Sequence, residues 1–138
     1  GGDANAIEPG KRMLSSMTPT IILNDGEPFI IIGSPGGSQI ITTVLQVVLN
    51  SIDFDMNIRQ AIEAPRIHHQ WMPDSIFYEM GTLTEEVKKE LSEMGYRFWD
   101  LDVETRIIGI AEGIMIDRKN KIIYGASDPR GGGLAVGY

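Results

Sequence analysis

The sequence predicts an α+β domain, and three features of the 138-residue chain support that prediction. A tight-turn signal, Asn24-Asp25-Gly26, separates two β-branched and apolar segments, which is the pattern of a hairpin. A long apolar segment over 38–51 has the length of a helix. The last third of the chain alternates short apolar segments with turns and predicts further strands. Strands and helices do not alternate regularly, so a layered domain is favoured over repeated βαβ units.

The hairpin is the most specific of these features. Residues 18–23 are rich in β-branched side chains, and the apolar residues 28–32 form the expected return strand. Asp25-Gly26 supplies the positive φ angles that tight hairpins require. Because the return strand is continuously apolar, we expect both of its faces to be covered.

Two helices are expected after the hairpin. The first runs from Ser38, as N-cap, to about Ser51. Its side chains are apolar nearly all round, which predicts a helix buried between layers. The second covers about 57–64 and should stop before Pro65, since the residue before a proline avoids the helical conformation.

A third helix and several short strands complete the prediction. Residues 84–94 form an amphipathic helix with Thr84 as its N-cap and Gly95 as its C-terminal stop. Its inward side chains are expected to be Val87, Leu91 and Met94. Strands are predicted over 67–71, 75–79, 97–101, 106–108, 113–117 and 121–125, with a turn at 118–120.

Composition excludes several classes of function. The net charge is −7 and the 12 Lys and Arg residues are scattered, which argues against a nucleic-acid partner. The absence of cysteine excludes disulfides, thiolate metal sites and a Cys nucleophile. The chain opens on GGDAN with neither Met nor a signal peptide, so we expect it to begin within a longer protein. We treat 1–138 as a single domain, in which the small and polar residues 1–12 form a loop or arm.

The loop Gly33-Ser34-Pro35-Gly36-Gly37, directly before the first helix, is the strongest candidate site. The first N–H groups of a helix have no intrahelical partner, and the helix dipole adds positive charge there. Glycine lets a ligand approach that backbone closely, so Gly36 and Gly37 suit an oxyanion, a carboxylate or a phosphate. The loop is no Walker A motif, Rossmann fingerprint or nucleophile elbow. The spacing alone is equally compatible with a purely structural turn.

Ser15 and Ser16 form a second candidate, upstream of the hairpin. Two adjacent hydroxyls before a strand are typical of backbone capping. They also suit donation to a substrate carboxylate, with help from neighbouring N–H groups.

Further polar motifs are interpreted as structural. His68-His69 lies in an expected strand, so the two rings should point to opposite faces, and we predict no zinc site. Asp128-Pro129-Arg130 predicts a local ion pair or turn rather than catalysis. Thr42-Thr43 lies inside the expected first helix and has no free α-amine that could activate a nucleophile.

The remaining acidic and aromatic candidates are also assigned to structure. Asp53 and Asp55 should end the long helix in solvent rather than act as a carboxylate pair. Trp71 and Trp99 are expected in the core or at an interface, because an acidic surface does not suit base stacking.

Taken together, four segments resemble the γ-glutamyltranspeptidases (glutathione hydrolases), members of the N-terminal-nucleophile hydrolase superfamily. These segments are GGDANAIEPGKRMLSSMTPTII, GSPGGSQIITTVLQVVLNSIDF, AIEAPRIHHQW and YGASDPRGGGLAVGY. The resemblance implies a four-layer αββα fold, built from a large and a small subunit that arise by self-cleavage of one precursor. This chain is similar to the C-terminal part of the small subunit.

The resemblance also implies roles for individual residues. Gly36 and Gly37 would donate backbone N–H groups to the oxyanion, and Gly37 would also contact the substrate. Ser15 and Ser16 would bind the α-carboxylate of the glutamyl group. The family's nucleophile, an N-terminal Thr that uses its own α-amine as base, would precede Gly1 and is absent from this chain. Neither a metal nor a cofactor is implied.

The resulting hypothesis is a γ-glutamyl transferase and hydrolase of which this chain is one part, inactive when isolated. Its expected partners are glutathione and related compounds, amino-acid or peptide acceptors, and the large subunit of the same precursor. Bacterial relatives lead us to expect a periplasmic or secreted protein. The alternatives are a pseudoenzyme, an acylase or a poly-γ-glutamate-processing enzyme of the same fold, or an inert binding module. The paired serines favour a substrate with a free α-carboxylate.

Overall fold

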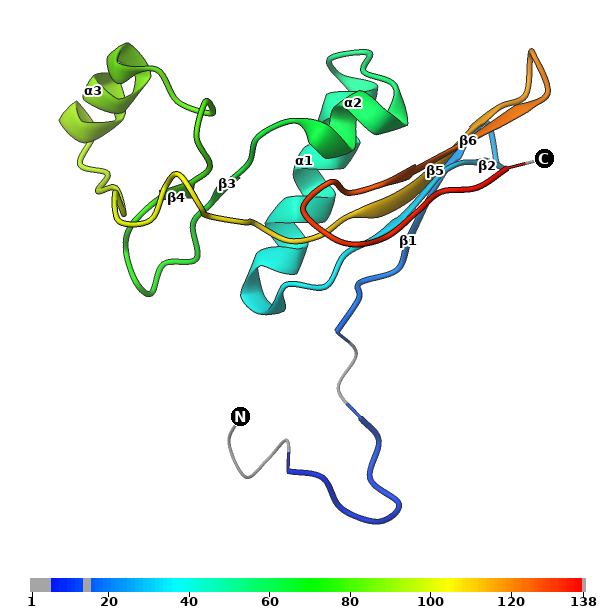
Figure 1. Cartoon of the computed structure of the whole chain (residues 1–138), viewed down its shortest axis with the longest axis horizontal. Coiled ribbons are helices and arrows are strands. Elements are labelled where there is room, and N and C mark those ends of the chain that lie inside the picture. The colour runs from blue at the N-terminus through cyan, green and yellow to red at the C-terminus, as the bar shows by residue number, and fades with distance from the viewer. Residues whose placement is uncertain (1–5, 14–15, 138) are drawn as a thin grey trace.

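The computed structural model describes residues 6–13 and 16–137 and confirms an α+β fold. Figure 1 shows one twisted sheet with α1 and α2 on one side of it and a smaller lobe that carries α3. Within the described residues, no helix has the length and apolar character needed to cross a membrane. In chain order, the elements are β1 (Thr20–Asn24), β2 (Glu27–Gly33), the 3-10 turn η2 (Gly37–Gln39), α1 (Ile40–Ile52), α2 (Ile58–Glu63), β3 (Ile67–His68), β4 (Phe77–Tyr78), α3 (Glu85–Glu93), β5 (Glu112–Asp117) and β6 (Ile122–Ser127).

The main sheet has four antiparallel strands in the order β1-β2-β5-β6. The predicted hairpin between β1 and β2 is confirmed, with Asp25 at φ 52° and Gly26 at φ 82°. The second predicted turn, over 118–120, joins β5 to β6. Strand β2 is central, and its last residue, Gly33, leads into the glycine loop.

The hydrophobic core lies between one face of this sheet and the helices α1 and α2 (Figure 1). Ile30 and Ile32 of β2 are 0% and 2% exposed, whereas the intervening Ile31 is only partly buried. The expectation that both faces of β2 are covered is therefore wrong for the described residues. Alternation along the strand sends Ile31 to the opposite face. That face also carries exposed apolar side chains: Ile21, Leu23, Ile114 and Ile123.

The first helix begins later than the sequence predicts. Ser38 lies inside η2, and the N-cap of α1 is Gln39, which makes no side-chain capping bond. Only the side of α1 that faces the sheet is buried, and Ile41 on another side is 71% exposed. The second helix matches its prediction: Asn57 and Gln60 form a reciprocal capping box, and the helix ends before Pro65.

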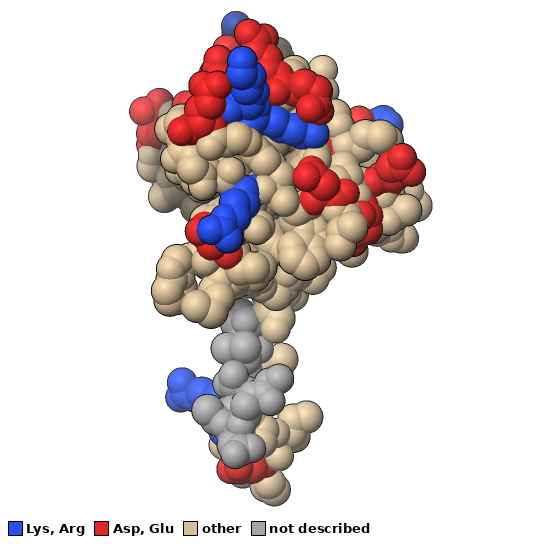
Figure 2. All heavy atoms as spheres, turned by 90° about the vertical axis from the view of Figure 1, so that its left-hand side faces the viewer, with Lys and Arg blue, Asp and Glu red and all other residues tan. Residues whose placement is uncertain are grey.

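Helix α3 buries none of its side chains completely. Thr84 caps α3 by accepting a hydrogen bond from the Val87 N–H at 3.2 Å, and Gly95 follows the helix at φ 96°. None of the α3 residues is buried, and Met94 is 71% exposed, so the predicted inward face is wrong. Figure 2 shows the end of the molecule with the lobe that carries α3, where acidic and basic side chains are interspersed.

The predicted strands around this lobe are shorter or missing. Strands β3 and β4 have two residues each, and the segment 97–101 contributes only an isolated bridge between Phe98 and Ile76. The segment 106–108 is not a strand, because the Ile108 N–H and C=O groups bond to side chains instead of to a neighbouring strand.

Candidate functional site

The glycine loop connects the end of β2 to the start of η2 and α1. Gly36 adopts φ 142° and Gly37 adopts φ 59°, conformations that L side chains rarely adopt. Both residues are exposed, and neither N–H donates to any group among residues 6–13 and 16–137. The loop therefore presents two neighbouring N–H donors to solvent near the positive end of α1, as an oxyanion site requires.

The upstream serine segment lies directly against this loop. Ser15 lies outside the described residues, so its predicted role is not tested. Ser16 is exposed, and it precedes Met17, whose carbonyl oxygen accepts a hydrogen bond from the Ser34 N–H at 3.0 Å. Thr18, at φ 42°, turns the chain from this contact into β1. Tertiary structure thus brings the Ser16–Met17 segment beside the loop, although the two lie far apart in the chain.

A backbone segment, residues 108–110, packs against the other side of the loop. Ser34 is fully buried, and its Oγ accepts a hydrogen bond from the Ile110 N–H at 3.0 Å. Thr43 Oγ1 donates to the Ile108 carbonyl at 3.4 Å. Gly109, at φ 67°, fits between the two hydroxyls, since a Cβ there would lie 2.3 Å from Thr43 Oγ1 and 2.9 Å from Ser34 Oγ. Only glycine fits at this close approach.

Four charged side chains form a buried cluster behind residues 108–111. The Asp128–Arg130 ion pair that the sequence predicts is confirmed at 3.0 Å. Two further partners were not predicted: Arg66 binds Asp128 at 2.7 Å, and Glu79 binds Arg130 at 2.6 Å. Neither Arg66 nor Glu79 lies in a motif that suggests such pairing, because their partners are distant in sequence.

This cluster holds the segment that supports the glycine loop. Arg66 donates to the Ile108 carbonyl at 2.8 Å, and Glu79 accepts from the Ile108 N–H at 2.9 Å. Asp128 accepts from the Ala111 N–H at 2.8 Å. The loop thus rests on backbone that is fixed by buried charges.

Two members of the cluster, Asp128 and Arg130, have pKa values shifted in the direction that favours their charged forms. Burial by itself would raise the pKa of Asp128, but the Ala111 and Arg130 N–H groups and the Arg66 guanidinium together hold it below its ordinary value. Burial likewise opposes the charge on Arg130, whereas Glu79 and Asp128 raise its pKa overall. Burial lowers the pKa of Arg66 despite its ion pair, yet a guanidinium stays charged in proteins. We therefore assign the cluster to structure and not to proton transfer.

The two histidines have separate partners. His68 is buried, with Nδ1 2.8 Å from Thr42 Oγ1 and Nε2 2.9 Å from Gln70 Oε1. His69 contacts Asp74 at 3.0 Å on the surface. In the part of the chain that the structure describes, no group of three or more His, Asp or Glu residues is arranged to hold a metal ion.

The exposure of the remaining acidic and aromatic candidates tests the positions predicted for them. Asp53 is the C-cap of α1, and Asp55 is exposed beyond it, as predicted. Trp71 and Trp99 are 76% and 40% exposed, so a core position is wrong for both within the described residues. Trp99 stacks on Phe77 with the ring centroids 5.5 Å apart, which explains its partial burial.

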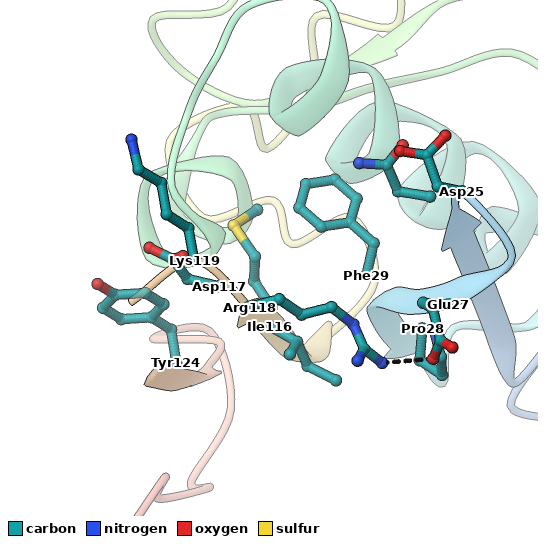
Figure 3. Close-up of a pocket in the computed structure, with 11 residues that line it drawn as sticks. Asp25, Glu27, Pro28, Phe29, Ile116, Asp117, Arg118, Lys119 and Tyr124 are labelled. Atoms are coloured by element: carbon teal, nitrogen blue, oxygen red, sulfur yellow. Dashed lines mark hydrogen bonds and ion pairs between the residues drawn. The ribbon is translucent and has the colours of Figure 1, made fainter. Parts of the chain in front are cut away.

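A hollow of about 500 Å³ lies at the other end of the sheet, between the β1–β2 and β5–β6 turns. Figure 3 shows Phe29 and Tyr124 around it and the 2.8 Å ion pair between Arg118 and Glu27 at its edge. None of the residues predicted to bind substrate lines this hollow. The two N–H donors of the glycine loop therefore remain the candidate site.

Comparison with known proteins gives a consistent result. The sequence model of the family described as "Gamma-glutamyltranspeptidase" matches residues 2–138. The glutathione hydrolase proenzyme of Escherichia coli (strain K12) is 47% identical over 139 residues, which cover 100% of this chain and 23% of that protein. The chain spans about a quarter of the length of the curated relatives that it matches.

Solved structures agree with the sequence matches. A Thr-to-Ala mutant of Helicobacter pylori gamma-glutamyltranspeptidase superimposes with a TM-score of 0.80 at 48% identity, over 95% of this chain and 69% of that chain. The Bacillus anthracis transpeptidase enzyme CapD superimposes with a TM-score of 0.77 at 29% identity, over 96% of this chain and 77% of that chain.

Proposed function

Because the chain belongs to the gamma-glutamyltranspeptidase family, we propose that it forms part of an enzyme that cleaves the γ-glutamyl amide of glutathione and related compounds. The observation that carries this proposal is the position of the Gly36 and Gly37 N–H groups. They face solvent beside the Ser16–Met17 segment. One substrate could therefore place its developing oxyanion at the glycine N–H groups and its carboxylate at the serine segment.

In the proposed reaction, an N-terminal Thr from outside this chain attacks the amide carbonyl and forms an acyl-enzyme. The negative charge on the carbonyl oxygen is stabilised by the Gly36 and Gly37 N–H groups, and removal of one such donor typically costs about 10²–10³ in rate. Ser15 and Ser16 bind the α-carboxylate. Water, an amino acid or a peptide then accepts the glutamyl group.

The exposed face of the sheet supports a composite protein. Ile21 and Ile123 on that face are 64% and 69% exposed, and sheets of this kind bury such a face against a second sheet. We assign that second sheet to the remainder of the same precursor, including its large subunit. The isolated chain would then lack both the nucleophile and half of its layers.

The test is release of p-nitroaniline from γ-glutamyl-p-nitroanilide by the complete, self-cleaved precursor. We expect turnover by the complete protein and none by the isolated 138-residue chain. No release from a verified two-subunit preparation would refute the proposal. Turnover by the isolated chain would refute the composite site.

A transpeptidase with a different acyl substrate is the second candidate, because the fold also superimposes on the transpeptidase CapD at 29% identity. The higher identity to the glutathione hydrolase proenzyme, 47%, favours glutathione-like substrates. Competition between glutathione and a γ-linked glutamate oligomer in the nitroanilide assay separates the two, since the preferred substrate inhibits at the lower concentration.

Replacement of both Ser15 and Ser16 by Ala in the complete protein should mainly raise KM. A hydrogen bond to a charged group contributes about 1.5–3 kcal/mol, so we expect KM to rise at least about tenfold while kcat changes little. Initial rates over a range of nitroanilide concentrations measure both constants. Ser92→Ala on the exposed helix α3 is the control and should change neither. A fall in kcat at constant KM would mean that the serines act on the reacting carbonyl instead.

A further inference from the structure

The direction of each oxyanion donor depends on the peptide plane to which it belongs. In a trans peptide, the C=O of one residue and the N–H of the next are coplanar and point in opposite directions. The Pro35 carbonyl therefore sets the direction of the Gly36 N–H. The Gly36 carbonyl sets that of the Gly37 N–H in the same way.

The two planes are held by different kinds of hydrogen bond. The Gly36 carbonyl accepts from the Gln39 N–H at 3.1 Å, a backbone bond that comes with the turn before α1. The Pro35 carbonyl instead accepts from the Ser34 hydroxyl at 2.7 Å. The direction of the Gly37 N–H is thus set by backbone folding, whereas that of the Gly36 N–H depends on one side chain.

The Ser34 hydroxyl is itself fixed in direction. It is fully buried, and it accepts from the Ile110 N–H at 3.0 Å. Because a hydroxyl has a single hydrogen and Ile110 can only donate, that hydrogen is directed to the Pro35 carbonyl. The result is a relay from Ile110 N–H through Ser34 Oγ–H to the Pro35–Gly36 peptide.

Gly36 adds no second hydrogen bond to this peptide, because its N–H donates to no group in the described residues. Its φ of 142° is open to glycine without a side-chain penalty, and it carries no Cβ that could pack against the loop. The Pro35–Gly36 plane would therefore lose its anchor if the Ser34 hydroxyl were removed. A hydrogen bond to the carbonyl also polarises the peptide, which strengthens its N–H as a donor.

We propose that Ser34 is a positioning residue of the oxyanion site: its hydroxyl aims and polarises the Gly36 N–H through the Pro35 carbonyl. This inference rests on the proposed function. Ser34 touches no substrate in this scheme, and its contribution is confined to the state in which charge develops on the carbonyl oxygen. Its loss should therefore change kcat and leave substrate binding unchanged.

Ser34→Ala in the complete precursor tests this inference. We expect kcat, measured per mole of cleaved protein, to fall about 10–100-fold with KM within about threefold, because a misaimed donor costs less than a deleted one. Ser34→Cys retains a weak donor of similar shape and should give an intermediate kcat. If the Ala variant is not cleaved, the Cys variant supplies the comparison.

The matched control is Thr43→Val. It removes another fully buried hydroxyl at the same junction, bonded to the Ile108 carbonyl at 3.4 Å, but outside the relay. It should lower Tm about as much as Ser34→Ala and leave kcat within about twofold. Equal loss of kcat in both variants would show that packing alone matters and would overturn the inference.

A second measurement separates stabilisation of the charged tetrahedral state from binding of the substrate in its ground state. A boronic-acid analogue of the γ-glutamyl group adds the nucleophilic hydroxyl and becomes an anionic, tetrahedral adduct that mimics the charged intermediate. Ser34→Ala should therefore weaken inhibition by this analogue at least tenfold. Inhibition by free glutamate should stay unchanged. If the unsubstituted protein is active and the boronate inhibits Ser34→Ala equally well, this inference is overturned while the proposed function stands. No turnover by the unsubstituted protein would instead refute the proposed function.

Discussion

Replacement of Asp128 by Asn should lower the free energy of unfolding by about 3–5 kcal/mol, the usual cost of removing one partner of a buried ion pair. Arg66 is 1% exposed and would keep its charge without the carboxylate 2.7 Å away. The amide would also turn an NH₂ group toward donors, either toward the Ala111 N–H and Arg66 or toward the Arg130 N–H and its guanidinium. Thermal unfolding of the complete protein should show a Tm below that of the unsubstituted protein.

The control for this variant is Asp117→Asn. That carboxylate also has a lowered pKa, through its hydrogen bonds from Asn120, but it is the last residue of β5, at a partly exposed position outside the buried cluster. Its replacement should change Tm only slightly, because exposed charges contribute little to stability. Equal decreases in Tm for the two variants would contradict the assignment of the buried cluster as the support of the loop.

Acidification should reveal how much the charge on Asp128 contributes to the stability of the unsubstituted protein. Because the fold lowers the pKa of Asp128, this carboxylate contributes stability that is fully present above about pH 4 and is lost as pH falls through the lowered pKa. Tm should therefore decrease with pH in that acidic range. The Asn variant lacks this titration, so its Tm should depend less on pH there.

Replacement of Gly36 by Ala should lower kcat by about 10²–10³-fold, as expected when an oxyanion donor is displaced. A φ of 142° is unfavourable for any L side chain, and the new Cβ would lie 3.2 Å from Gly109 Cα. Gly109 cannot yield easily, because a buried charge cluster and the Ser34 hydroxyl fix residues 108–111. The loop must move instead, and the Gly36 N–H moves with it. Steady-state rates of nitroanilide release measure the effect.

Gly37→Ala provides the matched comparison, since it changes the neighbouring donor by the same methyl group. Its Cβ would meet nothing within 4 Å, and φ 59° costs an L residue only about 1–2 kcal/mol. We therefore expect kcat to fall by at most about 30-fold, less than in Gly36→Ala. If Gly37→Ala were the more damaging of the two, contact with Gly109 would not control the loop.

The features that the sequence predicts correctly depend on short-range interactions. The Asp25-Gly26 turn, the Thr84 cap and the Gly95 stop of α3 were visible in the sequence, because their hydrogen bonds and φ angles involve residues within about one turn. The glycine loop was visible for the same reason. The exposure of α3 was not, because an amphipathic pattern indicates which face is apolar but not whether anything covers it.

The sequence by itself therefore determined the α+β class, the hairpin, the cap of α3 and the place of the glycine loop before the first helix. Only the tertiary structure decided that the buried Ser34 hydroxyl accepts from the Ile110 N–H and that Arg66 and Asp128 share a buried ion pair. The partners in these contacts are 76 and 62 residues apart, respectively. No local propensity encodes such a pairing, because it forms only when the folded core excludes water and buried polar groups must bond to one another.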